Sequence, residues 1–203
     1  MTMKTYFSFD LDYFNFHGGK LKPFVDRAYS YLEEIRHFVA KARIPIVAVM
    51  NHQQMLPHVD ASRCDTLLNV DTHSDLCESD VVELNCGTWV AYVKWRKQGT
   101  FTWWHGDDVC VGDCGTYNLF SDRRKMVHKG MTDWKVASHI RCKQVPKLTS
   151  DIRSVGICLS PSYVDYEGEM TKMFKTWVSA HGVPYTKGRK DEHFGRKRRP
   201  PQT

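Results

Sequence analysis

The sequence predicts an α/β protein with three layers, in which a mainly parallel sheet lies between helices. Strand-like apolar runs alternate with helix-like segments in the first half of the chain. Several of these runs are apolar on both faces, which is typical of strands buried inside a parallel sheet. Because right-handed crossovers join parallel strands through helices, this alternation indicates one sheet covered on both faces.

The first predicted elements are a strand, a loop and a long helix. Residues 6–11 form a short aromatic and apolar run that ends in acids, and the pair Gly18-Gly19 then breaks the chain. From Pro23 to Ala42, apolar residues recur every three or four positions, which predicts an amphipathic helix over 23–42.

Further strands are predicted at 44–50 and 66–70, joined by a short helical or irregular crossover over 53–63. A helix is predicted to start near Gly87 and to cover the residues WVAYVKWRK, and a late core strand is predicted at 154–159. The stretch 100–150 has no clean period, so no element is predicted there.

The length of 203 residues favours a single domain, which we expect to span 1–186. The net charge of +6 is concentrated in the tail 187–203, where seven basic residues against two acidic ones give +5. The body carries only +1, which argues against a nucleic-acid-binding surface there. We expect the tail to be solvated, and a partner-binding role for it stays open.

The seven cysteines are an odd number without regular spacing, and no secretory signal pattern precedes the first strand. We therefore expect a reduced, cytoplasmic protein. No apolar run approaches the roughly 18 residues that a membrane span needs. The pair Cys110 and Cys114, with His105 and His128 nearby, offers an alternative zinc site, but no second pair follows.

Acids and histidines follow three of the predicted strands, where parallel sheets bind ligands. The six candidate metal ligands are Asp10, Asp12, His52, Asp71, His73 and Asp75. Alternate residues of an extended segment point to one side, so Asp71, His73 and Asp75 can line one site, as can Asp10 and Asp12. An isolated Asp-x-Asp often only caps a turn, and a lone histidine often only fills a loop. Four carboxylates together repel one another unless cations balance them, and this donor mixture suits manganese.

Two segments carry a resemblance to a known family. Val70 to Asp75 (VDTHSD) resembles the Asp-Ala-His-x-Asp motif of the arginase and agmatinase superfamily, and Ser8 to Asp12 (SFDLD) resembles its Ser-Phe-Asp-x-Asp motif. The second motif comes late in arginases but opens this chain, as in a compact, circularly permuted form of the fold. A small permuted family that includes peptide arginases is similar in two further segments, Asn85 to Trp89 and Ser160 to Tyr163.

The resemblance implies that the six ligands hold two manganese ions with a bridging hydroxide. It also implies conversion of arginine to ornithine and urea within a ribosomally made precursor peptide, which could dock through a leader segment. Asp75 would bind metal, orient the hydroxide and move its proton to the leaving amine. The arginase proton-shuttle histidine is replaced by Thr88, so we take His105 as the shuttle. The candidate guanidinium-binding residues are Glu83, Asn85, Ser160 and Glu167.

Three other functions stay open. A phosphatase of the haloacid dehalogenase type would use Asp10 and Asp12 as nucleophile and acid, but it expects Thr or Val at Tyr13 and gives His52 no role. A metal-dependent deacetylase of the same fold would cleave an amide at the same centre. A basic interaction protein would use the tail alone, with structural acids in the body.

Overall fold

The computed structural model describes residues 3–14, 21–75, 84, 86–94, 99–106 and 134–188. Four sequence predictions lie at least partly outside these ranges. They are the zinc alternative at Cys110 and Cys114, the end of the helix predicted from Gly87, most of the basic tail, and two candidate guanidinium-binding residues, Glu83 and Asn85.

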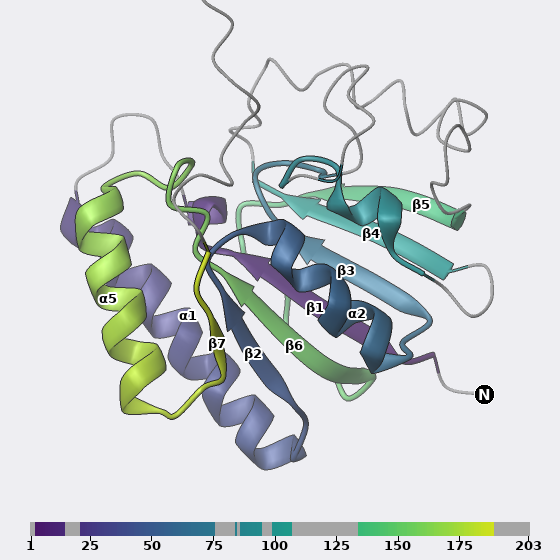
Figure 1. Cartoon of the computed structure of the whole chain (residues 1–203), viewed down its shortest axis with the longest axis horizontal. Coiled ribbons are helices and arrows are strands. Elements are labelled where there is room, and N and C mark those ends of the chain that lie inside the picture. The colour runs from purple at the N-terminus through teal and green to yellow at the C-terminus, as the bar shows by residue number, and fades with distance from the viewer. Residues whose placement is uncertain are drawn as a thin grey trace, which may run out of the picture.

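Seven strands form one sheet, and the predicted α/β class with a parallel sheet is confirmed (Figure 1). The strands are β1 (Thr5–Asp10), β2 (Ile46–Val49), β3 (Thr66–Val70), β4 (Gly99–His105), β5 (Trp134–Arg141), β6 (Ile152–Cys158) and β7 (Tyr185–Thr186). Their order across the sheet is β5-β4-β3-β1-β6-β2-β7, and every neighbouring pair is parallel. The first strand of the chain therefore lies in the middle.

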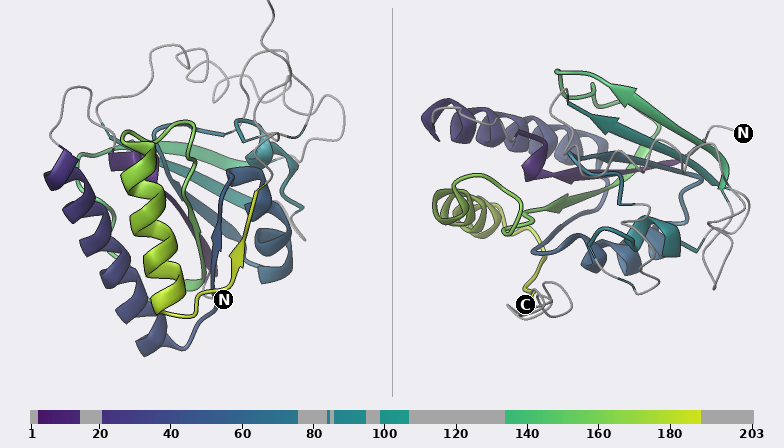
Figure 2. Two further views of the ribbon diagram at one scale, coloured as in Figure 1. Left: turned by 60° about the vertical axis from the view of Figure 1, so that its left-hand side comes forward. Right: turned by 90° about the horizontal axis from the view of Figure 1, so that it is seen from above.

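Helices cover both faces of the sheet (Figures 1 and 2). They are α1 (Leu21–Ala42), α2 (Leu56–Ser62), α5 (Glu167–Ala180) and the short 3-10 helices η1 (Leu11–Phe14), η2 (His52–Met55) and η3 (Trp89–Tyr92). Alternation along β1 separates two apolar clusters, because Phe7 and Phe9 pack with α1 and α5 whereas Tyr6 packs with α2 and η3. The molecule thus has the three layers that the sequence predicts.

The connections explain why polar residues gather near β1. The crossover from β1 through α1 runs to β2 on one side, and the crossover from β2 through α2 returns past β1 to β3. Because both are right-handed and run in opposite directions, α1 and α2 lie on opposite faces. The chain leaves β1 toward α1 but leaves β3 toward η3, which packs on the α2 side. Loops that diverge in this way open the crevice in which α/β sheets bind ligands.

Two predictions of local structure were wrong or incomplete. The helix predicted from Gly87 is reduced to the four residues of η3, and Val93 is already extended. Trp89, Val90 and Ala91 are all buried, so this segment has no polar helical face to expose. The stretch without predicted structure contains β4 and β5, and β4 alternates buried with part-buried residues as a strand should.

Candidate metal centre

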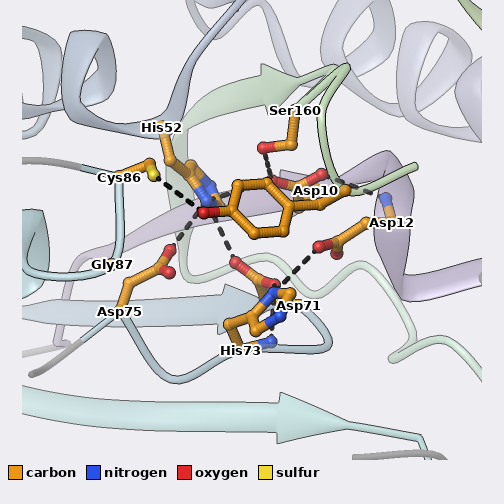
Figure 3. A pocket seen from close by; sticks show the side chains of 10 residues that line it. Asp10, Asp12, His52, Asp71, His73, Asp75, Cys86, Gly87 and Ser160 are labelled. Carbon is orange, nitrogen blue, oxygen red and sulfur yellow. Dashed lines mark hydrogen bonds and ion pairs between the residues drawn. The ribbon is translucent and has the colours of Figure 1, made fainter. Parts of the chain in front are cut away.

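The six predicted ligands line one cavity at the carboxyl edge of the sheet (Figure 3). Asp10 ends β1, Asp12 lies in η1, and His52 begins η2 directly after β2. The other three follow β3, which pairs with β1 in parallel register. The described residues of the lining are Asp10, Asp12, His52, Asp71, His73, Asp75, Cys86, Gly87, Ser160 and Tyr163. The sheet order thus brings together residues that the sequence places more than 60 positions apart.

One ring nitrogen of His52 faces three carboxylates. The distances from its Nδ1 to Oδ2 are 3.1 Å for Asp10, 3.0 Å for Asp71 and 2.7 Å for Asp75. A ring nitrogen carries at most one proton, so it cannot donate a hydrogen bond to all three acids. A cation at this convergence would be bound by oxygen and nitrogen ligands at once, which is the arrangement of a metal site.

A second group shares Asp71 with the first. The Nδ1 atom of His73 lies 3.0 Å from Asp12 Oδ2 and 3.6 Å from Asp71 Oδ1, whereas His52 approaches the other oxygen of Asp71. Asp12, Asp71 and His73 form one group of potential ligands, and His52, Asp71 and Asp75 form another. The buried acids and histidines can therefore hold a metal ion, with Asp71 at the junction of the two groups.

The electrostatics of this edge are unfavourable without a cation. Burial and the Asp71 carboxylate raise the pKa of Asp75 to about 8 and that of Asp12 to about 6. Burial and the Asp12 carboxylate raise the pKa of Asp10 well above its ordinary value. Burial also acts on Asp71, but its hydrogen bonds with the two histidines outweigh this and lower its pKa. A bound divalent cation would favour the charged form of every carboxylate.

Surrounding groups orient the candidate ligands. Ser8 Oγ lies 3.1 Å from Nε2 of His52, so a proton held at Nε2 leaves Nδ1 free to face the carboxylates. Trp89 donates its Nε1–H to Asp75 Oδ2 at 2.6 Å, and its ring lies 5.1 Å from that of His52. The amide of Asn69 lies beneath the site, with Nδ2 at 3.4 Å from Asp71 Oδ2 and 3.5 Å from Asp75 Oδ2. Sequence reasoning missed these three residues.

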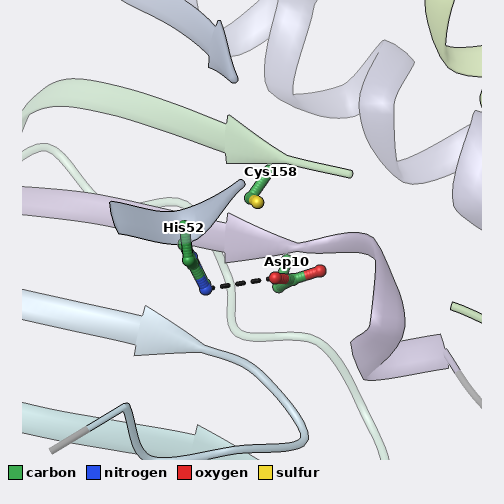
Figure 4. Close-up of side chains that lie close together, drawn as sticks. All are labelled: Asp10, His52 and Cys158. Carbon is green, nitrogen blue, oxygen red and sulfur yellow. Dashed lines mark ion pairs between the residues drawn. The ribbon is translucent and has the colours of Figure 1, made fainter. Parts of the chain in front are cut away.

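Cys158 forms a third group with Asp10 and His52 (Figure 4). Its thiol lies 3.2 Å from Ser160 Oγ and 3.6 Å from the Met50 carbonyl, and it is not among the cavity-lining residues. Burial and the neighbouring Asp10 carboxylate raise the pKa of this thiol well above its usual value. Cys158 therefore lies within reach of two candidate ligands but, among the described residues, is outside the cavity lining.

The other predicted site residues have mixed outcomes. Ser160 lines the cavity and donates a short hydrogen bond to Asp10 Oδ2. Glu167 is exposed at the start of α5 and is not in the lining. Glu83 and Asn85 lie outside the described residues.

His105 does not reach the cavity. It ends β4, which is separated from β1 by β3, and it is not among the lining residues. Its Nε2 lies 3.3 Å from His139 Nδ1, and its Nδ1 lies 2.9 Å from the Gly106 carbonyl oxygen. Burial lowers the pKa of this ring. Its position therefore gives no support to its predicted role as proton shuttle.

Cys86, Gly87 and Tyr163 line the cavity but were not predicted as site residues. They lie within the two further segments that resemble the permuted family, and this was the signal that could have identified them. The two segments follow β3 and β6, which both lie next to β1, so they reach the same edge of the sheet.

Comparisons with models of protein families, with curated proteins and with solved structures find no match to this chain. Within the described residues, no helix combines the length and the apolar character that a membrane crossing requires. Inference about function therefore starts from the geometry and chemistry of the cavity.

Proposed function

We propose that this protein is a manganese-dependent hydrolase that converts arginine residues of a peptide to ornithine and releases urea. The observation that carries the proposal is the junction at Asp71, whose two oxygens face two different histidine groups. Such a junction suits two neighbouring cations, and the sequence motifs that supply it resemble those of ureohydrolases. We also propose that the fold is a circularly permuted form of the arginase fold and that the protein is cytoplasmic.

The donor set fits two manganese ions. His52, Asp75, Asp10 and Asp71 would hold one ion, and His73 and Asp12 would hold the other together with Asp71. Hard carboxylate oxygens with imidazole nitrogens suit manganese better than a soft, thiolate-binding metal. When bound, the two ions supply a hydroxide at neutral pH and stabilise the charge that develops on the substrate.

The protein groups would orient the reaction. Asp75 would accept a hydrogen bond from the nucleophile, since its carboxylate lies in the cavity and Trp89 holds one of its oxygens. We take the substrate to be an arginine in a peptide, with the basic tail available to an acidic leader segment.

Incubation of the manganese-loaded protein with arginine-containing peptides tests the proposal. Conversion to ornithine lowers the peptide mass by about 42 Da and releases urea, both of which are measurable. The same peptides with lysine in place of arginine are the control for the substrate. Acetate release from acetyl-lysine peptides would indicate the deacetylase alternative instead. No mass change on any arginine peptide would overturn the proposal.

A further inference from the structure

Few side chains of the cavity remain to contact a substrate once the six candidate ligands are set aside. Of the ten lining residues, four are not candidate ligands, and Gly87 among them has no side chain. Ser160 is engaged with Asp10 Oδ2. Besides Ser160, the described lining side chains that carry a proton on a heteroatom are Cys86 and Tyr163, whose thiol and hydroxyl contact each other.

Tyr163 contacts two other lining residues, His73 and Cys86. Its ring packs edge-to-face on His73, with 5.1 Å between the ring centroids, and its hydroxyl lies 3.6 Å from Cys86 Sγ. Figure 3 shows Cys86 and His73 on different sides of the cavity. A tight turn after β6 fixes the backbone, because the Tyr163 N–H donates to the Ser160 carbonyl at 2.9 Å. The position of the phenol is thus determined by the fold.

Tyr163 lies beside the most exposed of the six candidate ligands. The His73 side chain is 15 % exposed, whereas the other five candidate ligands are at most 5 % exposed. Tyr163 is half-buried and packs on this most accessible ligand. A substrate side chain that reaches the acids from solvent would therefore pass along the Tyr163 ring and its hydroxyl.

Resting on the function proposed above, we infer that Tyr163 is a catalytic residue that gives its phenolic proton to the departing side-chain nitrogen of arginine. After water has added to the guanidinium carbon, the bond from that carbon to the side-chain nitrogen breaks. The electron pair stays on the nitrogen, which takes the proton, and the carbon leaves as urea. Both protons of the added water leave its oxygen: one restores the phenol, and the other passes to the same nitrogen and makes it an ammonium group. One water is consumed, and the positive charge passes from guanidinium to ammonium.

Tyr163→Phe tests this assignment, because it keeps the ring against His73 and removes only the hydroxyl. We expect kcat to fall about 100-fold, within the range for loss of a general acid, with manganese content and KM unchanged. A canavanine peptide has a leaving nitrogen of low basicity that needs less protonation. On the canavanine peptide, kcat of Tyr163→Phe should fall by less than about tenfold. Tyr185→Phe, which removes a tyrosine hydroxyl outside the described cavity lining, is the matched control and should keep kcat within about threefold.

A second measurement does not depend on turnover. The rate of alkylation of Cys86 by iodoacetamide is followed by mass spectrometry in the manganese-loaded wild-type protein. A saturating arginine peptide should slow it at least about fivefold, because the guanidinium fills the space beside Tyr163. Cys142, part-buried at the end of the β5 strand, should react at an unchanged rate. The lysine peptide should protect neither thiol.

The outcomes separate the two proposals. Urea release by the wild-type protein together with a fully active Tyr163→Phe variant would overturn only the role of Tyr163. The role of Tyr163 would also be overturned by an equal defect on arginine and canavanine peptides. Loss of manganese from the variant, or alkylation of Cys86 that the arginine peptide does not slow, would overturn the same role. No urea from the wild-type protein would overturn both proposals.

Discussion

Glu33, between α1 and α5, and Asp75, at the carboxyl edge of the sheet, are acids in opposite surroundings. Glu33 accepts hydrogen bonds from Trp177 and Arg36 and lies 3.0 Å from His181 Nε2. These partners outweigh its partial burial and lower its pKa. Asp75 is buried beside Asp71, and its pKa rises to about 8. The helical region lowers the pKa of its acid through hydrogen bonds within the protein, whereas the acids and histidines at the sheet edge could hold a metal ion.

The largest effect is expected from Asp71→Ala, because Asp71 joins both ligand groups. Manganese affinity should fall by more than about 100-fold, since even changes to surrounding groups cost about 10–100-fold. Urea release should be lost as well. Metal analysis after gel filtration measures the first effect. Glu33→Ala, in the other region, is the control and should retain manganese. Wild-type manganese content in Asp71→Ala would sink the assignment of the site.

Trp89→Phe should weaken manganese binding by about 10–100-fold. The change removes the N–H that holds Asp75 Oδ2 but leaves an aromatic ring near His52. Isothermal titration of metal-free protein with manganese gives the affinity. Trp177→Phe is a matched control, because it removes the corresponding N–H from Glu33. If both variants lose affinity equally, the two regions are not independent.

The strands next to β1 and the ligands were predictable because both rest on local patterns. The run 66–70 marks β3 within the chain, and Asp71, His73 and Asp75 come directly after it. The partners of these residues depend on strand order instead. The contact of Ser8 with His52 crosses 44 residues, and the misplaced His105 lies on a strand that is not next to β1. Neither fact can be obtained from spacing in the sequence.

Asp75→Asn should stabilise the metal-free protein, by at least about 1 kcal/mol at pH 7, the value of one pKa unit. The folded state raises the pKa of Asp75 from about 4 to about 8, so it disfavours the charged carboxylate. The stability of the wild-type protein should therefore fall between pH 4 and pH 8, and the variant should lose this decline. Urea denaturation after treatment with a chelator measures the free energy of unfolding at each pH. A variant that is less stable than wild type at pH 7 would show that the folded state does not disfavour the charged carboxylate of Asp75.

Glu33→Gln should give the smallest effect, with the opposite sign. Its side chain is 24 % exposed, so solvent screens the charge, and we expect a loss of about 0.5–1 kcal/mol at pH 7. The folded state lowers the pKa of Glu33, so its charge stabilises the protein above the ordinary glutamate pKa of about 4.3. This contribution is lost as pH falls through the lowered value, so the deficit of the variant should shrink between pH 7 and pH 3. Glutamine keeps an oxygen that can accept the Trp177 N–H, so the change isolates the charge. Unfolding curves at pH 7 and pH 3 test this, and a deficit that persists at pH 3 would mean that packing, not charge, joins the helices here.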